Sequence, residues 1–413
     1  MNLKEFVVSG ARIWKADEET LGPLSSFLYV RDGQILALGD AARDVDPRIP
    51  RIDLPGRVLV PGLIDAHVHL ELDPDIRTPT EQLAVPEPVR RSAMARRAGA
   101  MLVAGITTAR DCGGGQHLEH SLRDAIRIGE HVGPRLLCCG QPVTTPGGHC
   151  SFWGGEVEDR ADIERLVARE VEAESDWIKV MATGGVFTPG SRARDAQFDL
   201  PSLVSVVESA SRAGRSVAAH CHGTEGIANA VRAGVRTIEH ASFAGAEGFG
   251  TALDEALMRE MAEAELWVSP TVNGGWGRRI TDSKGEPSDF FRRMSALLRA
   301  QREHGIRFIA STDAGIPGVV HDDLVSGMIA FAQFADLRPV DVLRAATSEA
   351  ANALGLVQET GRISVGLSAD FLVLEGNPLD DLAVLRDSEF VVSRGEWFDR
   401  SHRETLGRTL KSG

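Results

Sequence analysis

Apolar and polar residues alternate along both ends of the chain. The alternation covers residues 4–60 and returns in residues 361–398, and a period of two is typical of β-strands with one buried face. Asp32-Gly33 lies between two such runs, which predicts a tight hairpin there. The simplest interpretation is one small β-domain, built from both ends of the chain, with a larger insert between them.

The insert repeats a different unit, in which short apolar runs alternate with amphipathic segments of helical spacing. Residues 161–175 and 200–213 are two of the predicted helices, the second with Asp199 as its N-cap and Pro201 in its first turn. Eight strand–helix units favour a (β/α)₈ barrel, with a doubly wound sheet as the alternative. The eight apolar runs cover residues 63–69, 105–111, 135–141, 177–183, 216–222, 236–241, 266–271 and 307–313.

Side chains that bind metals or transfer protons come at the ends of several of these runs. His67 and His69 are two residues apart, so both can face the same side of a strand and hold one ion. His220 and His240 come from neighbouring runs and can hold a second ion. Asp313 can ligate a metal through one oxygen and accept a proton through the other. Because barrel strands all open on one face at their C-terminal ends, we expect these groups to share a pocket.

Lys179 differs from the other candidates in its charge. Its ammonium would repel cations, and a lysine between Ile178 and Val180 in a strand is costly to bury. Reaction of its amine with carbon dioxide would give a carbamate, an anion able to bridge two metal ions. Each candidate also has an ordinary interpretation, such as a hydrogen-bonded core histidine, a surface lysine or an N-cap aspartate. Their joint occurrence at the ends of successive runs favours the metal site.

The segment from Pro61 to His69 resembles the opening motif of the amidohydrolase superfamily. The resemblance covers nearly the whole chain, and residues 366–374 are similar to the C-terminal return strand of that family. Within the superfamily, the prolidase-like branch, which includes imidazolonepropionase-like members, is most similar. Three segments carry that likeness: residues 178–185, 220–223 and 237–240. The resemblance implies a metal-dependent TIM barrel over residues 61–360 and a composite β-sandwich from residues 1–60 and 361–413.

The resemblance also implies a ligand set for two divalent metal ions, with zinc as the expected metal. A hydroxide shared by the ions would be the nucleophile, and Asp313 would pass its proton to the leaving amine. The sequence alone leaves the choice between His220 and His222 open, and we prefer His220 because it lies deeper in its strand. The implied ligands are His67 and His69 with Asp313 for the more buried ion, His220 and His240 for the second ion, and carboxylated Lys179 between the ions.

Residues that contact the substrate are less clearly marked. His149 matches the family position that contacts the reacting carbonyl or oxyanion, and a plain loop histidine is the alternative. His222 would lie at the pocket rim, near the substrate or capping a loop. Arg192 and Arg194 lie in a long loop and either bind a substrate carboxylate or are solvated. Asp65 either orients the histidine pair or makes local backbone bonds.

We predict a hydrolase that cleaves the amide bond of a dipeptide, an N-acyl amino acid or a related small amide, carbamate or urea. One alternative is hydrolysis of a cyclic amide or imidazolone ring. Lys179 argues against that reaction, because single-metal ring-opening relatives generally lack such a lysine. Another alternative, from outside enzymology, is a metal-binding regulatory protein on the same fold.

Composition narrows the partners and the compartment. With 45 Lys and Arg against 59 Asp and Glu, the net charge is −14, which disfavours nucleic acid as a partner. The five cysteines have neither zinc-knuckle nor disulfide-framework spacing, and no signal peptide or transmembrane stretch is visible. We therefore expect a cytoplasmic homo-oligomer with reduced thiols that acts on a small molecule and binds no membrane.

Overall fold

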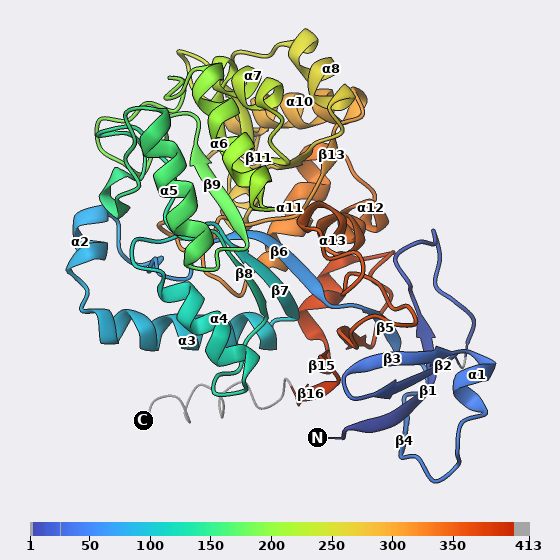
Figure 1. The fold of residues 1–413 in the computed structure, drawn as a ribbon. Helices are drawn as coiled ribbons and strands as arrows, with labels where there is room; N and C mark the ends of the chain where they lie inside the picture. The colour runs from blue at the N-terminus through green and yellow to red at the C-terminus, as the bar shows by residue number, and fades with distance from the viewer. Residues whose placement is uncertain (1–2, 25, 400–413) are drawn as a thin grey trace.

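Strands from both ends of the chain meet in one eight-stranded sheet of the computed structural model, which describes residues 3–24 and 26–399 (Figure 1). The sheet order is β16-β15-β14-β5-β1-β2-β3, and β4 also pairs with β1. The strands are β1 (Glu5–Ile13), β2 (Ser26–Arg31), β3 (Gln34–Leu38), β4 (Arg51–Asp53), β5 (Val58–Pro61), β14 (Phe371–Leu374), β15 (Phe390–Ser393) and β16 (Glu396–Asp399).

The two ends join where β5 pairs antiparallel with β14, with Val60 opposite Leu372. The predicted hairpin is confirmed, because β2 and β3 pair antiparallel around Asp32 and Gly33. Both turn residues have positive φ, 50° and 78°, as the tight turns of two-residue hairpins require. The composite β-sandwich and its boundaries stay predictions, and residues 400–413 of it lie outside the described part of the chain.

All eight apolar runs of the insert form strands. These strands build two wholly parallel sheets, one of three strands and one of five. In both sheets the spatial order follows the chain order, without the reversal that marks a doubly wound sheet. The mixed α/β fold is therefore confirmed. The strands are β6 (Leu63–Val68), β7 (Ile106–Asp111), β8 (Arg135–Cys138), β9 (Trp177–Met181), β10 (Ser216–Gly223), β11 (Thr237–Ala244), β12 (Trp267–Ser269) and β13 (Arg307–Phe308).

Single bridges connect the two parallel sheets at both junctions. Between β8 and β9, Val143 forms an isolated parallel bridge with Val180. Between β6 and the segment after β13, Val68 forms another with Ala314. Backbone hydrogen bonds support both junctions, from Val143 to the Lys179 carbonyl at 2.9 Å and from Ala66 to the Ala310 carbonyl at 3.2 Å. The ladders are therefore interrupted at these two places, although hydrogen bonds cross each of them.

Helices lie around the outside of the parallel strands (Figure 1). Both helices that the sequence analysis predicted in detail are present. Helix α6 begins at its predicted N-cap, where Asp199 accepts a hydrogen bond from the Ser202 amide at 2.9 Å. Helix α5 ends before Glu174, whose φ is 61°. The helices are α1 (Asp40–Arg43), α2 (Pro79–Ala84), α3 (Glu87–Val103), α4 (Leu118–Arg127), α5 (Arg160–Glu172), α6 (Leu200–Arg212), α7 (Thr224–Ala233), α8 (Glu255–Glu263), α9 (Gly274–Gly277), α10 (Asp289–Glu303), α11 (Leu324–Ala335), α12 (Pro339–Ala345) and α13 (Ser348–Leu354), with 3₁₀ turns η1 (Ser151–Trp153) and η2 (Leu382–Asp387).

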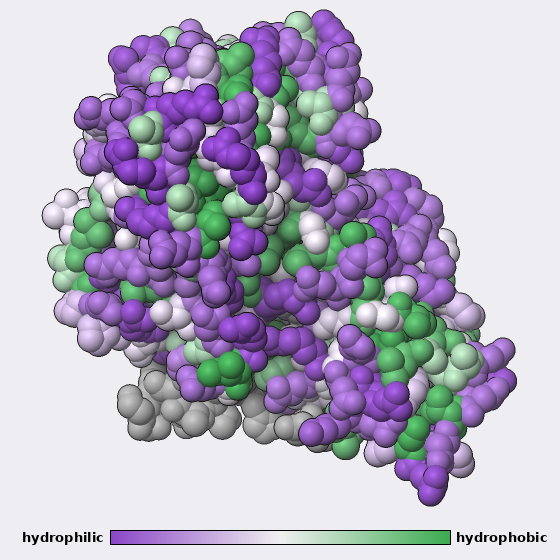
Figure 2. Space-filling view, in the orientation of Figure 1, coloured by the Kyte–Doolittle hydropathy of each residue, from purple (hydrophilic) through white to green (hydrophobic). Residues whose placement is uncertain are grey.

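The surface is mixed in polarity. Figure 2 shows a largely hydrophilic face, with hydrophobic residues gathered near the strands of the terminal sheet. Among the helices of the described chain, none combines the length and the apolar character needed to cross a lipid bilayer. All five cysteines are buried, and none forms a disulfide.

Asp370 ties the terminal sheet to the parallel strands. Its side chain is 2% exposed. It accepts hydrogen bonds from the Arg135 guanidinium at 3.0 Å, the Thr360 hydroxyl at 2.9 Å and the Arg394 backbone amide at 2.7 Å. Arg135 begins β8 and Asp370 directly precedes β14, so this carboxylate connects segments far apart in the sequence.

We expect Asp370→Ala to lower the free energy of unfolding by about 2–4 kcal/mol, because it leaves several donors without their acceptor. Denaturant unfolding measures the loss. Glu375→Ala is the matched control, since Glu375 is 73% exposed and pairs only with Arg57 among its described ion pairs, and it should change little. Equal losses in the two variants would contradict the role of Asp370.

Candidate metal centre

A cavity of about 190 Å³ lies where the parallel strands end. It receives side chains from β6, β9, β10 and β11, and from the segments after β8 and β13. Eight of the residues singled out in the sequence line it together: His67, His69, His149, Lys179, His220, His222, His240 and Asp313.

Three acceptor atoms converge on one point of this cavity. The Nε2 atoms of His67 and His69 are 3.3 Å apart. Asp313 Oδ1 lies 3.4 Å from the first nitrogen and 3.5 Å from the second. A tetrahedral zinc site with bonds of about 2.0–2.1 Å has ligand atoms about 3.3–3.4 Å apart. The triangle therefore has the size of one face of such a site.

The partners on the far side of each ring fix which nitrogen carries the proton. His69 Nδ1 lies 2.9 Å from the Gly113 carbonyl, which can only accept, so Nδ1 is the donor. His67 Nδ1 likewise donates to the Glu239 carboxylate at 2.8 Å. In the neutral rings the Nε2 lone pairs then point at one another and at Asp313, an arrangement that needs a cation or a proton between them.

His67 and His69 differ in how their surroundings affect protonation, because the pKa of His69 is lowered by burial and by the charge of His67. Burial lowers the pKa of His67, but the neighbouring Cys112 and Asp313 outweigh it and raise that pKa to about 9. A proton and a metal ion compete for the same lone pair, so metal binding would release this proton.

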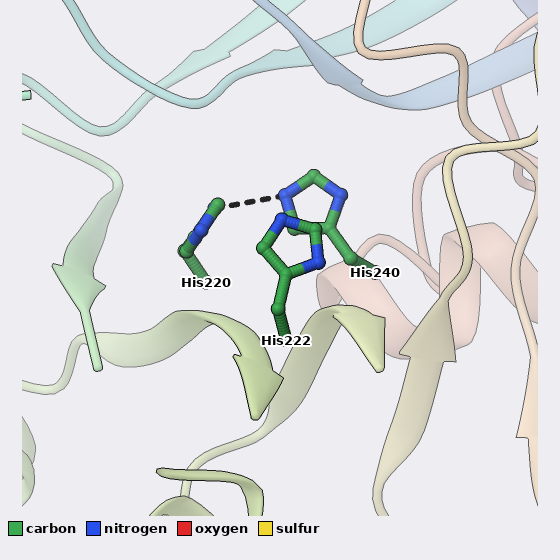
Figure 3. A group of neighbouring side chains, drawn as sticks. All are labelled: His220, His222 and His240. Atoms are coloured by element: carbon green, nitrogen blue, oxygen red, sulfur yellow. Dashed lines mark hydrogen bonds between the residues drawn. The ribbon is translucent and has the colours of Figure 1, made fainter. Parts of the chain in front are cut away.

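Figure 3 shows a second group of imidazoles, and one of them, His240, has its ring centroid 5.4 Å from that of His67. His220 Nδ1 and His240 Nε2 are 2.9 Å apart. His220 Nε2 donates to the Gly184 carbonyl at 3.1 Å, so its Nδ1 is the acceptor in the neutral ring. Burial lowers the pKa of both residues well below the usual value, which favours the neutral form that binds metals.

His222 belongs to the same group. Its Nδ1 lies 2.8 Å from the Ser242 hydroxyl, and its ring stacks on that of His240 with centroids 4.5 Å apart. One nitrogen from each of His220, His222 and His240 fits within a sphere of metal-ligand size, since these atoms lie within 4.8 Å of one another. The choice of His220 over His222 as the ligand stays a prediction.

Lys179 is buried in the lining of the same cavity. It is 1% exposed, and among the described residues its Nζ has no hydrogen-bond partner. Its charge lowers the pKa values of His69, His149 and His240, alongside the larger effect of burial. A buried ammonium without partners is costly, so the amine fits a group that is chemically modified or bound to another species.

Glu239 is the residue that the sequence analysis missed. It holds His67 through Nδ1, and its other oxygen accepts from Arg110 at 2.7 Å. Burial would raise the pKa of Glu239, but Arg110 and His67 hold it well below the usual range. Neighbouring residues of a strand normally point to opposite faces of the sheet, yet Glu239 and His240 both reach the site. The backbone is not regular β-strand here, because His240 has a φ of 69°.

Asp65 accepts hydrogen bonds from backbone amides, which was one of the two roles expected for it. It accepts from the His67 amide at 3.3 Å, from the Thr312 amide at 3.1 Å and from the Thr312 hydroxyl at 2.6 Å. These bonds join β6 to the segment that carries Asp313, which itself has a positive φ of 61°. Asp65 therefore sets the distance between two parts of the ligand triangle.

His149 lies deep in the cavity with an unused nitrogen. Its ring centroid is 4.5 Å from that of His220, and its buried Nδ1 has no partner among the described residues. Burial, with Lys179 and His69, lowers the pKa of His149 to about 3, so the ring is neutral. Gly185 leaves room for it, because a Cβ there would lie 2.4 Å from the imidazole.

Arg192 and Arg194 are not brought to the cavity. Arg192 Nε donates to Asp195 at 2.5 Å, and Arg194 Nε lies 3.7 Å from the same carboxylate. Their side chains are 66% and 45% exposed, and neither lines the cavity. This arrangement matches the solvated alternative more closely than contact with a substrate.

We expect Glu239→Gln to weaken metal binding by about 10–100-fold, because the amide no longer holds His67 with a full negative charge. Competition with a chromophoric zinc chelator measures the affinity. Glu247→Gln, on the exposed loop that follows β11, is the control and should bind as tightly as the unchanged protein. Unchanged affinity in Glu239→Gln would show that this carboxylate does not support a ligand.

Comparisons with known proteins cover the part of the chain that forms the cavity. The model of the amidohydrolase family matches residues 58–397, a range that contains every candidate ligand. An ochratoxinase of Aspergillus niger is 27% identical over 410 residues, covering 89% of this chain and 81% of that protein. An imidazolonepropionase of Methylobacterium sp. is 27% identical over 385 residues, covering 84% and 86%.

A solved structure extends the likeness to the fold. A prolidase complexed with N-methylphosphonate-L-proline has a TM-score of 0.82 and 26% identity, covering 96% of this chain and 100% of that one. The similarity therefore spans both the terminal sheet and the parallel strands around the cavity.

Proposed function

Because this chain belongs to the amidohydrolase family and is a hydrolase of carbon–nitrogen bonds, we propose that it cleaves small amides with two metal ions. Amide-bond hydrolysis is supported by the family and by its named relatives. The proposed ligands are His67, His69 and Asp313 for one ion, His220 and His240 for the other, and Lys179, as a carbamate, between them.

The observation that carries the proposal is the convergence, in a buried place, of atoms that can serve as metal ligands. Two imidazole nitrogens and a carboxylate oxygen lie 3.3–3.5 Å from one another, and two further imidazole nitrogens meet at 2.9 Å. Lys179 Nζ has no partner beside them. A carbamate on this amine would replace an unpaired positive charge by an anionic ligand, and bound metal ions would offset the cost of its burial.

The chain's own residues then have defined tasks. When bound, the two ions would supply positive charge that lowers the pKa of a water molecule and polarises the scissile carbonyl. Asp313 would accept the water proton on its free oxygen and deliver it to the leaving nitrogen. His149 would donate from its unpartnered nitrogen to the carbonyl oxygen as negative charge develops there.

The fold supports this placement of the ligands. We infer that the two parallel sheets together form one (β/α)₈ barrel, because hydrogen bonds cross both junctions and the strand order follows the chain. In such a barrel the C-terminal strand ends surround one active site. Zinc as the metal, the composite β-sandwich, the cytoplasmic location and the homo-oligomeric state stay predictions.

Opening of a cyclic amide or imidazolone ring is the alternative reaction, and the relatives named imidazolonepropionase are consistent with it. The same Asp313 proton transfer would serve both reactions. Lys179 favours the two-metal amide hydrolysis, because a single-metal reaction gives this buried amine no task.

We expect Asp313→Asn to lower kcat for amide substrates by about 10²–10⁴-fold, since asparagine cannot accept the proton. Release of amine from a panel of amides, carbamates, ureas and lactams identifies a substrate and measures the rate. Asp322→Asn, in the exposed part of the next loop, should keep full activity. A panel in which nothing is hydrolysed, or an Asp313→Asn variant of full activity, would contradict the proposal.

A further inference from the structure

Beyond the proposed ligands, the cavity wall is mostly apolar and aromatic. Trp153 and Met181 come from one buried apolar cluster, against which Phe187 packs. Met294 comes from the main core, where Phe249 and Trp276 pack against it. A ligand in this cavity therefore meets large apolar surfaces around the reacting centre.

The wall lacks a group for a carboxylate. Of the described residues that line the cavity, none is an arginine, and the one lysine is Lys179, which the proposed mechanism uses as a carbamate. Arg192 and Arg194 face Asp195 on the surface. Arg279 stacks on Phe290, with 3.4 Å between its guanidinium carbon and the ring centroid, and it does not line the cavity.

Apart from the proposed ligands and His149, three polar side chains of the wall already have partners. Asn273 donates its amide to the Thr312 carbonyl at 3.1 Å. Ser242 contacts His222 at 2.8 Å, and Thr271 contacts His240 at 2.9 Å. A carboxylate placed against this part of the wall, away from the proposed metal ligands and His149, would lose its hydration without gaining a guanidinium, an ammonium or a free donor, which is unfavourable.

We infer that the substrate is a neutral amide, carbamate or urea with an apolar or aromatic substituent and no free carboxylate. The inference rests on the proposed function and narrows it, because free dipeptides and N-acyl amino acids both carry a carboxylate close to the scissile bond. The apolar wall would bind the substituent, and the proposed ligands would face the amide.

A matched pair of substrates tests this inference. N-acetyl-2-phenylethylamine and N-acetyl-L-phenylalanine differ only by the carboxylate on the carbon next to the nitrogen. We expect kcat/KM of the metal-loaded enzyme to be at least about 10-fold higher for the neutral compound. An equal or higher kcat/KM for the carboxylate compound would overturn the inference.

A variant with an added positive charge at the cavity rim gives a second test of the inference. Val186 lines the cavity and is 74% exposed, so Val186→Arg places a guanidinium at the rim without burying it. It should raise the ratio of kcat/KM for the carboxylate compound to that for the neutral one by at least about 5-fold. Val365→Arg, at a position that is 57% exposed and does not line the cavity, should leave the ratio unchanged. Equal ratios in both variants would contradict the inference.

Binding separates this inference from the proposed reaction. Calorimetry on the metal-loaded Asp313→Asn protein compares the two compounds without turnover. Tighter binding of the neutral compound supports the inference even where the unchanged enzyme hydrolyses neither, in which case the proposed reaction fails alone. Tighter binding of the carboxylate compound, or no binding of either at millimolar concentration, overturns the inference.

Discussion

The convergence of His67 Nε2, His69 Nε2 and Asp313 Oδ1 is the constraint on which the rest of the site depends. Three acceptor atoms within 3.5 Å of one another repel each other unless a cation or proton lies between them. The protein holds them there from behind, through Glu239 and the Gly113 carbonyl. Such prior arrangement lowers the stability of the empty site and raises its affinity for a positive charge.

Two residues that line the cavity have unfavourable backbone conformations. His240 and Asp313 have φ of 69° and 61°, a conformation that is unfavourable for residues other than glycine and clusters at functional sites. Buried charge pairs lie in the scaffold around the cavity and the terminal sheet. Arg110 pairs with Glu239, which in turn contacts His67, and Asp370 joins the terminal sheet to the parallel strands. The unfavourable backbone angles of His240 and Asp313 therefore occur at the candidate site itself, and the buried charge pairs occur in the structure that surrounds it.

The sequence predicted the strands and the histidines, lysine and aspartate of the cavity lining for simple reasons. Short apolar runs with polar ends identified all eight parallel strands, and the spacing of two placed His67 and His69 on one side. Glu239 was missed because strand alternation places it opposite His240, and a positive φ cannot be read from that pattern. Arg192 and Arg194 depend on the path of a loop, where Asp195 pairs with both. Continuity of the strand ladder also depends on single tertiary hydrogen bonds, which leave no periodic signal.

Metal content per chain tests the central claim most directly. It is measured by elemental analysis on protein grown with zinc and purified without chelator, for the unchanged chain, Lys179→Ala and the exposed control Lys284→Ala. The two-metal account predicts about two ions in the unchanged chain and in the control, and about one or fewer in Lys179→Ala. About one ion per chain in all three proteins would mean that Lys179 is not a ligand, and the proposed mechanism would be wrong.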